Sequence, residues 1–165
     1  MQRERAARLL KQIQGRTALV VGDVIYDSFV YGPVERISRE APVPIRSERR
    51  REAMLGGAGN LARNTVSLGA QVRLVSVVGG DAEGRAATDM ARQACGEAAE
   101  LICAPDRITP SKVRYVSNNQ QMFCVDRDPA PGLAQAIQDA VFSAVERALE
   151  GADVLILSDY GRGVL

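Results

Sequence analysis

The fold of this chain is decided first by TALVVGD at residues 17–23, an apolar run that ends in glycine and aspartate. Within it, residues 17–21 are predicted to form a buried strand. Similar apolar runs at 72–78 and 154–157 predict two more buried strands. Apolar residues also recur at helical spacing in the segments 3–13, 60–68, 82–95 and 133–149. Apolar strands that alternate with helices indicate an α/β domain with a mostly parallel sheet.

The region between residues 28 and 55 does not fit this alternation. Its apolar and polar residues alternate poorly, and Pro33, Pro42 and Pro44 interrupt it. Because proline has no N–H to donate to a neighbouring strand, short strands at a sheet edge are expected here. We therefore predict a small β excursion that leaves the end of the first strand. Three further strands are predicted at 101–102, 112–117 and 122–126.

Composition and charge narrow the class of protein. The 165 residues suffice for one domain with a core, and 21 basic against 20 acidic residues leave a net charge of +1. This balance predicts neither a nucleic acid nor a membrane as a partner. The basic residues within 46–51 are interleaved with Glu48 and Glu52, which indicates a solvated strand face. The N-terminal segment lacks the apolar stretch of a secretory signal, so a cytoplasmic location is expected.

The absence of histidine excludes several kinds of chemistry. Ser-His-Asp and Cys-His catalysis and zinc sites with histidine ligands are all ruled out. Cys95, Cys103 and Cys124 lack the spacing of metal or redox motifs and are interpreted as buried, reduced thiols. Any chemistry must use carboxylates, lysine or arginine, backbone amides, or a metal bound through oxygen, and no metal site is assigned to this chain.

Polar side chains follow several of the predicted strands. They are Asp23 and Asp27 after the first strand, Asn60 at the start of a helix, and Asp159 after the last strand. Ligands of open α/β sheets lie beyond the carboxyl ends of the strands, and carboxylates and carboxamides suit sugar hydroxyls. The glycines of 56–59 would let the backbone approach such a ligand, or would form only a structural turn. Alternatively, Asp23 and Asp159 have structural roles, in which Asp23 caps a turn and Asp159 caps a helix.

Two further features leave alternatives open. Residues 57–62 fit the dinucleotide-binding pattern G-x-G-x-x-A, with Asp81 about twenty residues on. That pattern requires a hydrophobic strand directly before it, and the charged residues 47–52 argue against one. Lys112 and Arg114 lie two positions apart on a predicted strand and so share a face. We assign Lys112 to a substrate phosphate, with a solvated strand edge as the alternative, and assign Arg114 to neither role.

Several short segments occur in a recognisable order. VVGDVIYD at 20–27, GGAGN at 56–60 and GGDAEG at 79–84 together resemble the ribokinase (phosphofructokinase-B type) carbohydrate kinases. Four other segments are YGP at 31–33, RISREAPVPI at 36–45, SNNQQ at 117–121 and LSDYGRG at 157–163. These resemble, more narrowly, the heptose-7-phosphate kinase branch that serves ADP-heptose synthesis for lipopolysaccharide.

The resemblance implies a three-layer α/β/α kinase in which the excursion at about 28–55 is a lid over the sugar and often a homodimer contact. It implies a phosphosugar substrate, and ATP and Mg²⁺ as cofactors of the complete enzyme, with none of these cofactors held tightly by this chain. Asp27 and Asn60 would bind sugar hydroxyls, and Asp159 would stand at the inner wall of the sugar site. The full set of predicted substrate-binding residues is Asp27, Gly56, Gly57, Asn60, Lys112 and Asp159, with Asp23 and Gln120 added.

The chain also departs from the family it resembles. The family usually has arginine where Asn118 and Cys124 stand, and lysine where Arg162 stands, which leaves a related phosphosugar or an unphosphorylated sugar open as the substrate. The family's catalytic Gly-x-Gly-Asp motif and its Asn-x-x-Glu segment do not occur. We therefore expect residues 1–165 to be the N-terminal part of a sugar kinase domain, inactive alone and marginally stable or self-associating. A non-catalytic sugar-binding or dimerising module is the alternative.

Overall fold

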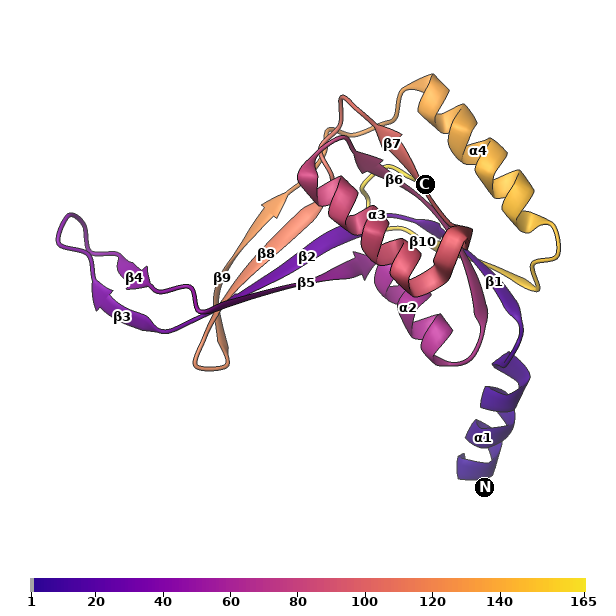
Figure 1. The fold of residues 1–165 in the computed structure, drawn as a ribbon, viewed down its shortest axis with the longest axis horizontal. Helices are drawn as coiled ribbons and strands as arrows, with labels where there is room; N and C mark the ends of the chain where they lie inside the picture. Colours follow the sequence, from indigo (N-terminus) through magenta and orange to yellow (C-terminus); the bar gives the residue numbers. More distant parts are fainter. Residues whose placement is uncertain (1) are drawn as a thin grey trace.

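Four parallel strands form the central sheet of the computed structural model, which describes residues 2–165 (Figure 1). They are β1 (Thr17–Gly22), β6 (Gln71–Gly79), β7 (Ala99–Ala104) and β10 (Val154–Ser158), in the order β10-β1-β6-β7. Because β1 lies between two other strands, its apolar side chains are enclosed, and Leu19 and Val20 are both 0% exposed. The run that opens the fold is therefore one of the two inner strands of the sheet.

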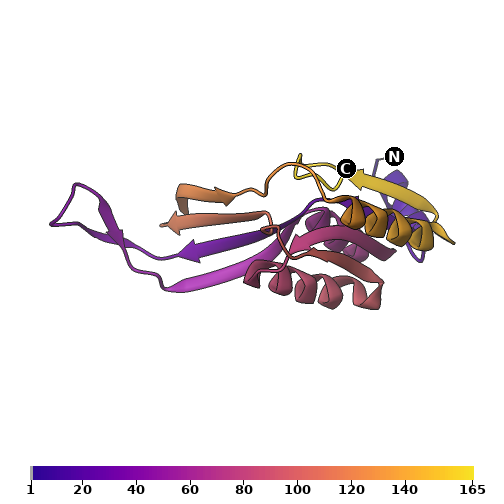
Figure 2. The same ribbon diagram turned by 90° about the horizontal axis from the view of Figure 1, so that it is seen from above.

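Helices cover both faces of this sheet (Figure 2). Successive side chains of a strand point to opposite faces, so Val20 packs with α2 (Ala58–Ser67) and α3 (Ala82–Cys95). Leu19 and Val21 instead pack with α4 (Gln135–Leu149) on the other side. The predicted three-layer α/β/α arrangement is confirmed. The remaining helices are α1 (Gln2–Ile13) and a short 3₁₀ helix at Gly96–Ala98.

A second sheet, called the lid below, extends from the end of the central sheet (Figure 1). Its strands are β2 (Val24–Tyr31), β5 (Arg50–Gly57), β8 (Ser111–Ser117) and β9 (Gln120–Arg127), in the order β5-β2-β8-β9. The sequence predicted a β excursion at about 28–55 and missed that β8 and β9 join it. β8 pairs in parallel with β2 across a long sequence separation, and no local pattern reports such a pairing.

The two faces of the lid differ in chemistry. One, called the charged face, carries Asp27, Phe29, Tyr31, Lys112, Arg114, Cys124 and Asp126, which the strand registers place on the same side. The opposite, aromatic face carries Tyr115 and Phe123, whose rings stack with centroids 4.4 Å apart, and also Val125. The alternation along β8 and β9 thus separates ion pairs from apolar side chains.

A narrow hairpin, called the arm, projects from the outer end of the lid (Figure 1). Its strands are β3 (Val34–Ile37) and β4 (Pro44–Arg46). Arg46 donates hydrogen bonds to the carbonyls of Gly32 (3.1 Å) and Val116 (2.9 Å), and also to that of Val30. The prediction of a solvated face is wrong for Arg46, because its guanidinium satisfies backbone carbonyls where the arm leaves the lid.

The neighbouring basic residues behave as predicted. Arg49 pairs with Glu35, Arg50 with Glu52 and Arg51 with Glu48, and all six side chains are solvated. These exposed pairs contribute little to stability. They do explain how a strongly charged segment forms strand β5, since its outer half faces water.

Two predictions of burial are wrong. The apolar run at 154–157 forms β10, but Val154 is 47% and Leu157 is 61% exposed. β10 is an edge strand that pairs only with β1 in the described part of the chain, so much of its apolar surface is uncovered. Cys103 and Cys124 are exposed free thiols, because they lie on edge strands β7 and β9. Within residues 2–165, no helix is long and apolar enough to cross a membrane.

Candidate functional site at the base of the lid

Asp27 lies on the charged face near the base of the lid. Its neighbours in register are Lys112 on β8 and Met54 on β5. The Asp27 carboxylate forms an ion pair with Arg114, and the Asp27 side chain is only 16% exposed. Lys112 pairs with Asp126 at 2.5 Å. The structure therefore brings together Asp27 and Lys112, as the sequence predicted, and adds Arg114, which it did not.

Of the two predicted glycines, Gly56 lies directly beside the Asp27 carboxylate. A Cβ atom added to Gly56 would stand 2.6 Å from Oδ2 of Asp27, so only glycine leaves room for the carboxylate in this position. Gly57 has φ +56° and turns the chain from β5 into α2, a conformation that L side chains rarely adopt. Asn60 follows in the first turn of α2 and is exposed. Gly56 thus lies beside Asp27, and the chain continues through Gly57 to Asn60 at the start of α2.

Asp23, also predicted as a site residue, has its carboxylate directed at backbone N–H groups. It is 1% exposed, and its carboxylate accepts hydrogen bonds from the backbone N–H groups of Tyr160 (2.8 Å), Arg162 (3.0 Å) and Val164 (3.1 Å). Its carbonyl accepts from the N–H of Ala58 at 2.9 Å. The carboxylate of Asp23 is thus buried and bound by three backbone N–H groups. Asp23 ties the loop after β10 to the start of α2, which is closer to the turn-capping alternative.

The two remaining predicted residues are Asp159 and Gln120. Asp159 is exposed after β10, and its Oδ1 accepts from the N–H of Gly161 at 2.7 Å. Gln120 stands opposite Ser117 at the outer end of the lid. That is five strand positions beyond Lys112, about 16 Å away. The structure does not bring Gln120 to the base of the lid.

The dinucleotide alternative is contradicted by the structure. Residues 57–62 follow β5, an antiparallel lid strand with an exposed outer half, instead of a buried parallel strand. Asp81 is committed elsewhere, since its carboxylate accepts from the N–H of Gly84, the N–H of Thr109 and the Thr109 hydroxyl. Partial burial raises the pKa of Asp81, but these hydrogen bonds and Arg127 outweigh it and hold the pKa below its ordinary value.

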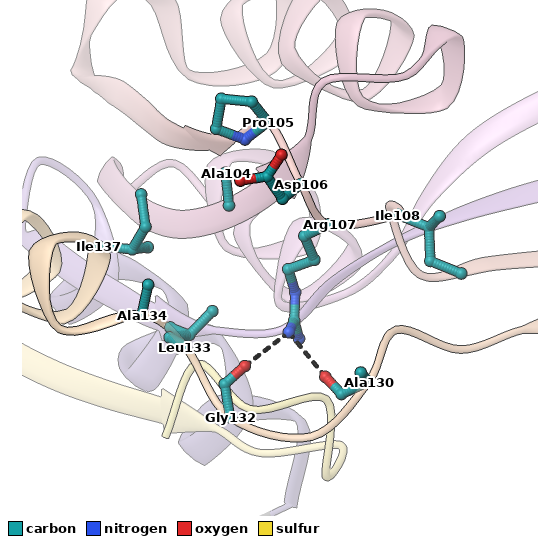
Figure 3. A pocket seen from close by; sticks show the side chains of 10 residues that line it. All are labelled: Ala104, Pro105, Asp106, Arg107, Ile108, Ala130, Gly132, Leu133, Ala134 and Ile137. Atoms are coloured by element: carbon teal, nitrogen blue, oxygen red, sulfur yellow. Dashed lines mark hydrogen bonds between the residues drawn. The ribbon is translucent and has the colours of Figure 1, made fainter.

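A cavity of about 440 Å³ lies between the end of β7 and the start of α4 (Figure 3). Arg107 crosses it and donates to the carbonyls of Ala130 and Gly132, both at 2.9 Å, and also to that of Arg162. Burial lowers the pKa of Arg107, and the charge of Asp23 partly offsets this. None of the predicted site residues lines this cavity. Arg107 therefore links backbone carbonyls of two neighbouring loops. The sequence analysis missed this role, because an arginine in a loop gives no local signal.

Comparison with known proteins agrees with this geometry. A family model described as "pfkB family carbohydrate kinase" matches residues 16–162. A "Bifunctional protein HldE" of Caulobacter vibrioides is 48% identical over 96% of this chain and 32% of its own length. A "D-beta-D-heptose 7-phosphate kinase" of Bordetella bronchiseptica is 43% identical over 94% of this chain and 49% of its own length. The chain thus spans about a third to a half of these relatives.

Solved structures support the same architecture. The phosphofructokinase-2 of Escherichia coli, solved in complex with fructose-6-phosphate, aligns with a TM-score of 0.67 at 18% identity. The alignment covers 88% of this chain and 45% of the other. A phosphofructokinase from Staphylococcus aureus gives a TM-score of 0.65 at 12% identity. At these identities the likeness shows a shared fold.

Proposed function

Because this chain belongs to the pfkB family of carbohydrate kinases, we propose that it supplies the sugar-binding part of a heptose-phosphate kinase. The whole protein would transfer the γ-phosphate of ATP to the anomeric hydroxyl of D-glycero-D-manno-heptose 7-phosphate. The observation that carries this proposal is the Asp27 carboxylate beside the bare backbone of Gly56, four residues before the exposed Asn60. Carboxylate and carboxamide groups at such a junction suit a ligand rich in hydroxyls.

Each residue would contribute to orientation. Asp27 would accept hydrogen bonds from sugar hydroxyls, and the carboxamide of Asn60 would donate and accept at the neighbouring hydroxyls. Gly56 and Gly57 would line the floor, Asp159 would stand at the inner wall, and Lys112 would face the substrate phosphate. Phosphoryl transfer depends mainly on positioning and electrostatic stabilisation, so this part of the site would set the acceptor hydroxyl in place.

ATP and Mg²⁺ are proposed for the whole protein, where they would provide the phosphoryl donor and neutralise its charge. Among residues 2–165, no three acidic or cysteine side chains converge as a metal site would require. We therefore assign no residue of this chain to Mg²⁺ and derive no step through it. A cytoplasmic location, where ATP is abundant, belongs to the same proposal.

The test is a kinase assay on the whole protein with heptose 7-phosphate, fructose 6-phosphate and unphosphorylated heptose as acceptors. We expect turnover with the first, and the Asp27→Asn variant should raise the sugar KM about 10- to 100-fold, the cost of a hydrogen bond to a charged group. The exposed Asp106→Asn is the matched control and should behave as wild type. Absence of turnover with all three acceptors would sink the proposal.

We also propose that the aromatic face of the lid forms a homodimer contact. Phe123 is 53% and Val125 is 43% exposed on edge strand β9, an apolar surface that a second lid would cover. This contact would equally serve the alternative function, a dimerising or sugar-binding module without catalysis. Light scattering of the whole protein should give twice the chain mass, and Phe123→Asp should halve it. A wild-type monomer at micromolar concentration would refute the contact.

A further inference from the structure

We infer that Arg114 is a positioning residue for sugar binding, which acts by holding the Asp27 carboxylate in one orientation. The inference rests on the proposed function, because it concerns the same site. It gives a role to Arg114, which the sequence analysis assigned neither to a substrate phosphate nor to a solvated strand edge.

Arg114 is held on two sides. Its guanidinium donates from Nη1 to Oδ1 of Asp27, and it lies over the ring of Phe29, 5.0 Å from the centroid. The Arg114 side chain is 25% exposed and that of Asp27 is 16% exposed. A partly buried ion pair that also rests on an aromatic ring is far less mobile than a solvated pair.

The second carboxylate oxygen of Asp27 lies beside the backbone of Gly56. Oδ2 occupies the space in which a side chain at Gly56 would lie. Because Arg114 holds Oδ1, rotation of the carboxylate would break this hydrogen bond, and Oδ2 stays in the space beside Gly56. The remaining lone pairs of Oδ2 are thereby presented in a set direction before the sugar arrives, which lowers the entropic cost of binding.

A competing role for Arg114 is direct contact with the substrate phosphate. Arginine has five N–H donors, and the bond to Asp27 uses one of them. The two roles predict different couplings. A positioning residue acts through Asp27, so its removal should have no effect once Asp27 is gone, whereas a phosphate ligand should act independently of Asp27.

The charged face offers a matched control. Arg50 pairs with Glu52 at 3.2 Å and lies 4.3 Å from the ring centroid of Tyr31. It has the same kinds of partner as Arg114 but stands farther out on the lid, away from Asp27. The Arg50→Gln substitution removes an ion pair and a cation–π contact and leaves the base of the lid intact.

The experiment measures kcat, the KM for sugar and the KM for ATP in the whole protein. Arg114→Gln should raise the sugar KM about tenfold or more, with the ATP KM within about twofold of wild type. Arg114→Lys should recover part of the loss, since lysine keeps the charge without the fork of donors. The double variant with Asp27→Asn should bind sugar no worse than Asp27→Asn alone, and Arg50→Gln should match wild type.

The outcomes separate the inference from the function it rests on. An active wild type with an unchanged sugar KM in Arg114→Gln overturns the positioning role. So does a loss that multiplies with that of Asp27→Asn and disappears with unphosphorylated heptose, which identifies a phosphate ligand. A wild-type protein without sugar-dependent turnover overturns the proposed function and this inference with it.

Discussion

The carboxylate of Asp23 accepts a hydrogen bond from the backbone N–H of Val164 at 3.1 Å, although 141 positions separate the two residues. Two further N–H groups of the same loop bind this carboxylate. One buried side chain therefore organises the segment that follows β10. The loop includes Asp159, so the position of a proposed site residue depends on a buried carboxylate.

Replacement of Asp23 by alanine should destabilise the chain strongly. Three backbone donors would lose a charged acceptor in a buried place, and we expect a loss of about 3 kcal/mol in the free energy of unfolding. Urea-induced unfolding measures this loss. The control is Asp159→Asn, which alters one local hydrogen bond at an exposed position and should change stability by less than about 0.5 kcal/mol. Equal losses of stability in the two variants would show that the Asp23 carboxylate does not stabilise the loop after β10.

The two glycines at the end of β5 should respond differently to alanine. Gly57→Ala would force a side chain into φ +56° and within 2.2 Å of the Asp23 carbonyl, so it should cost at least about 2 kcal/mol. Gly56→Ala meets only the movable end of Asp27 and should cost about 1 kcal/mol or less. It should nevertheless raise the sugar KM, because the displaced carboxylate no longer meets the sugar. Thermal unfolding and sugar kinetics, measured on both variants, separate these effects.

Asp81 should make stability depend on acid pH. Its pKa in the folded chain lies below the ordinary 3.8, so the ionised carboxylate stabilises the fold above about pH 4. That contribution is lost as the pH falls through the folded pKa. The free energy of unfolding should therefore drop more steeply from pH 5 to pH 3 in wild type than in Asp81→Asn. Parallel curves for the two proteins would show that Asp81 does not contribute.

Arg46 should control the mobility of the arm. Arg46→Met would leave carbonyls of Gly32 and Val116 without this donor, and amide hydrogen exchange should speed up in residues 33–47. The central sheet should exchange as before. Arg49→Met removes only a solvated pair with Glu35 and serves as the control. Unchanged exchange in the arm of Arg46→Met would show that other contacts hold it.

The sequence predicted much of the fold because its signals are local. The helix at 82–95 was predicted with the bounds of α3, and the strand at 72–78 lies within β6. Gly69, the residue after the helix predicted at 60–68, has φ +91° and donates from its N–H to the carbonyl of Val66. Helical spacing, apolar runs and terminal glycines all act within a few residues, so they can be read without knowledge of the tertiary structure.

The site was predicted less completely. Asp27 and Gly56 do lie side by side, and Gly57 and Asn60 follow Gly56 along the chain into α2. The sequence left two roles open for Asp23, because an aspartate after a strand looks the same in sequence whether it faces a ligand or a backbone loop. Arg114 was given no role, because its partner Asp27 is 87 positions away.

By itself, the sequence determined the layered α/β architecture, the presence of a β excursion and the family resemblance, since these depend on residue type and short spacing. Only the tertiary structure decided which strands complete the lid, that β10 is an exposed edge, and which carboxylate is buried and which faces outward. These depend on pairings between distant segments. A hydrogen bond such as that between Asp23 and Val164 is set by the packing of the whole chain, and no nearby residue encodes it.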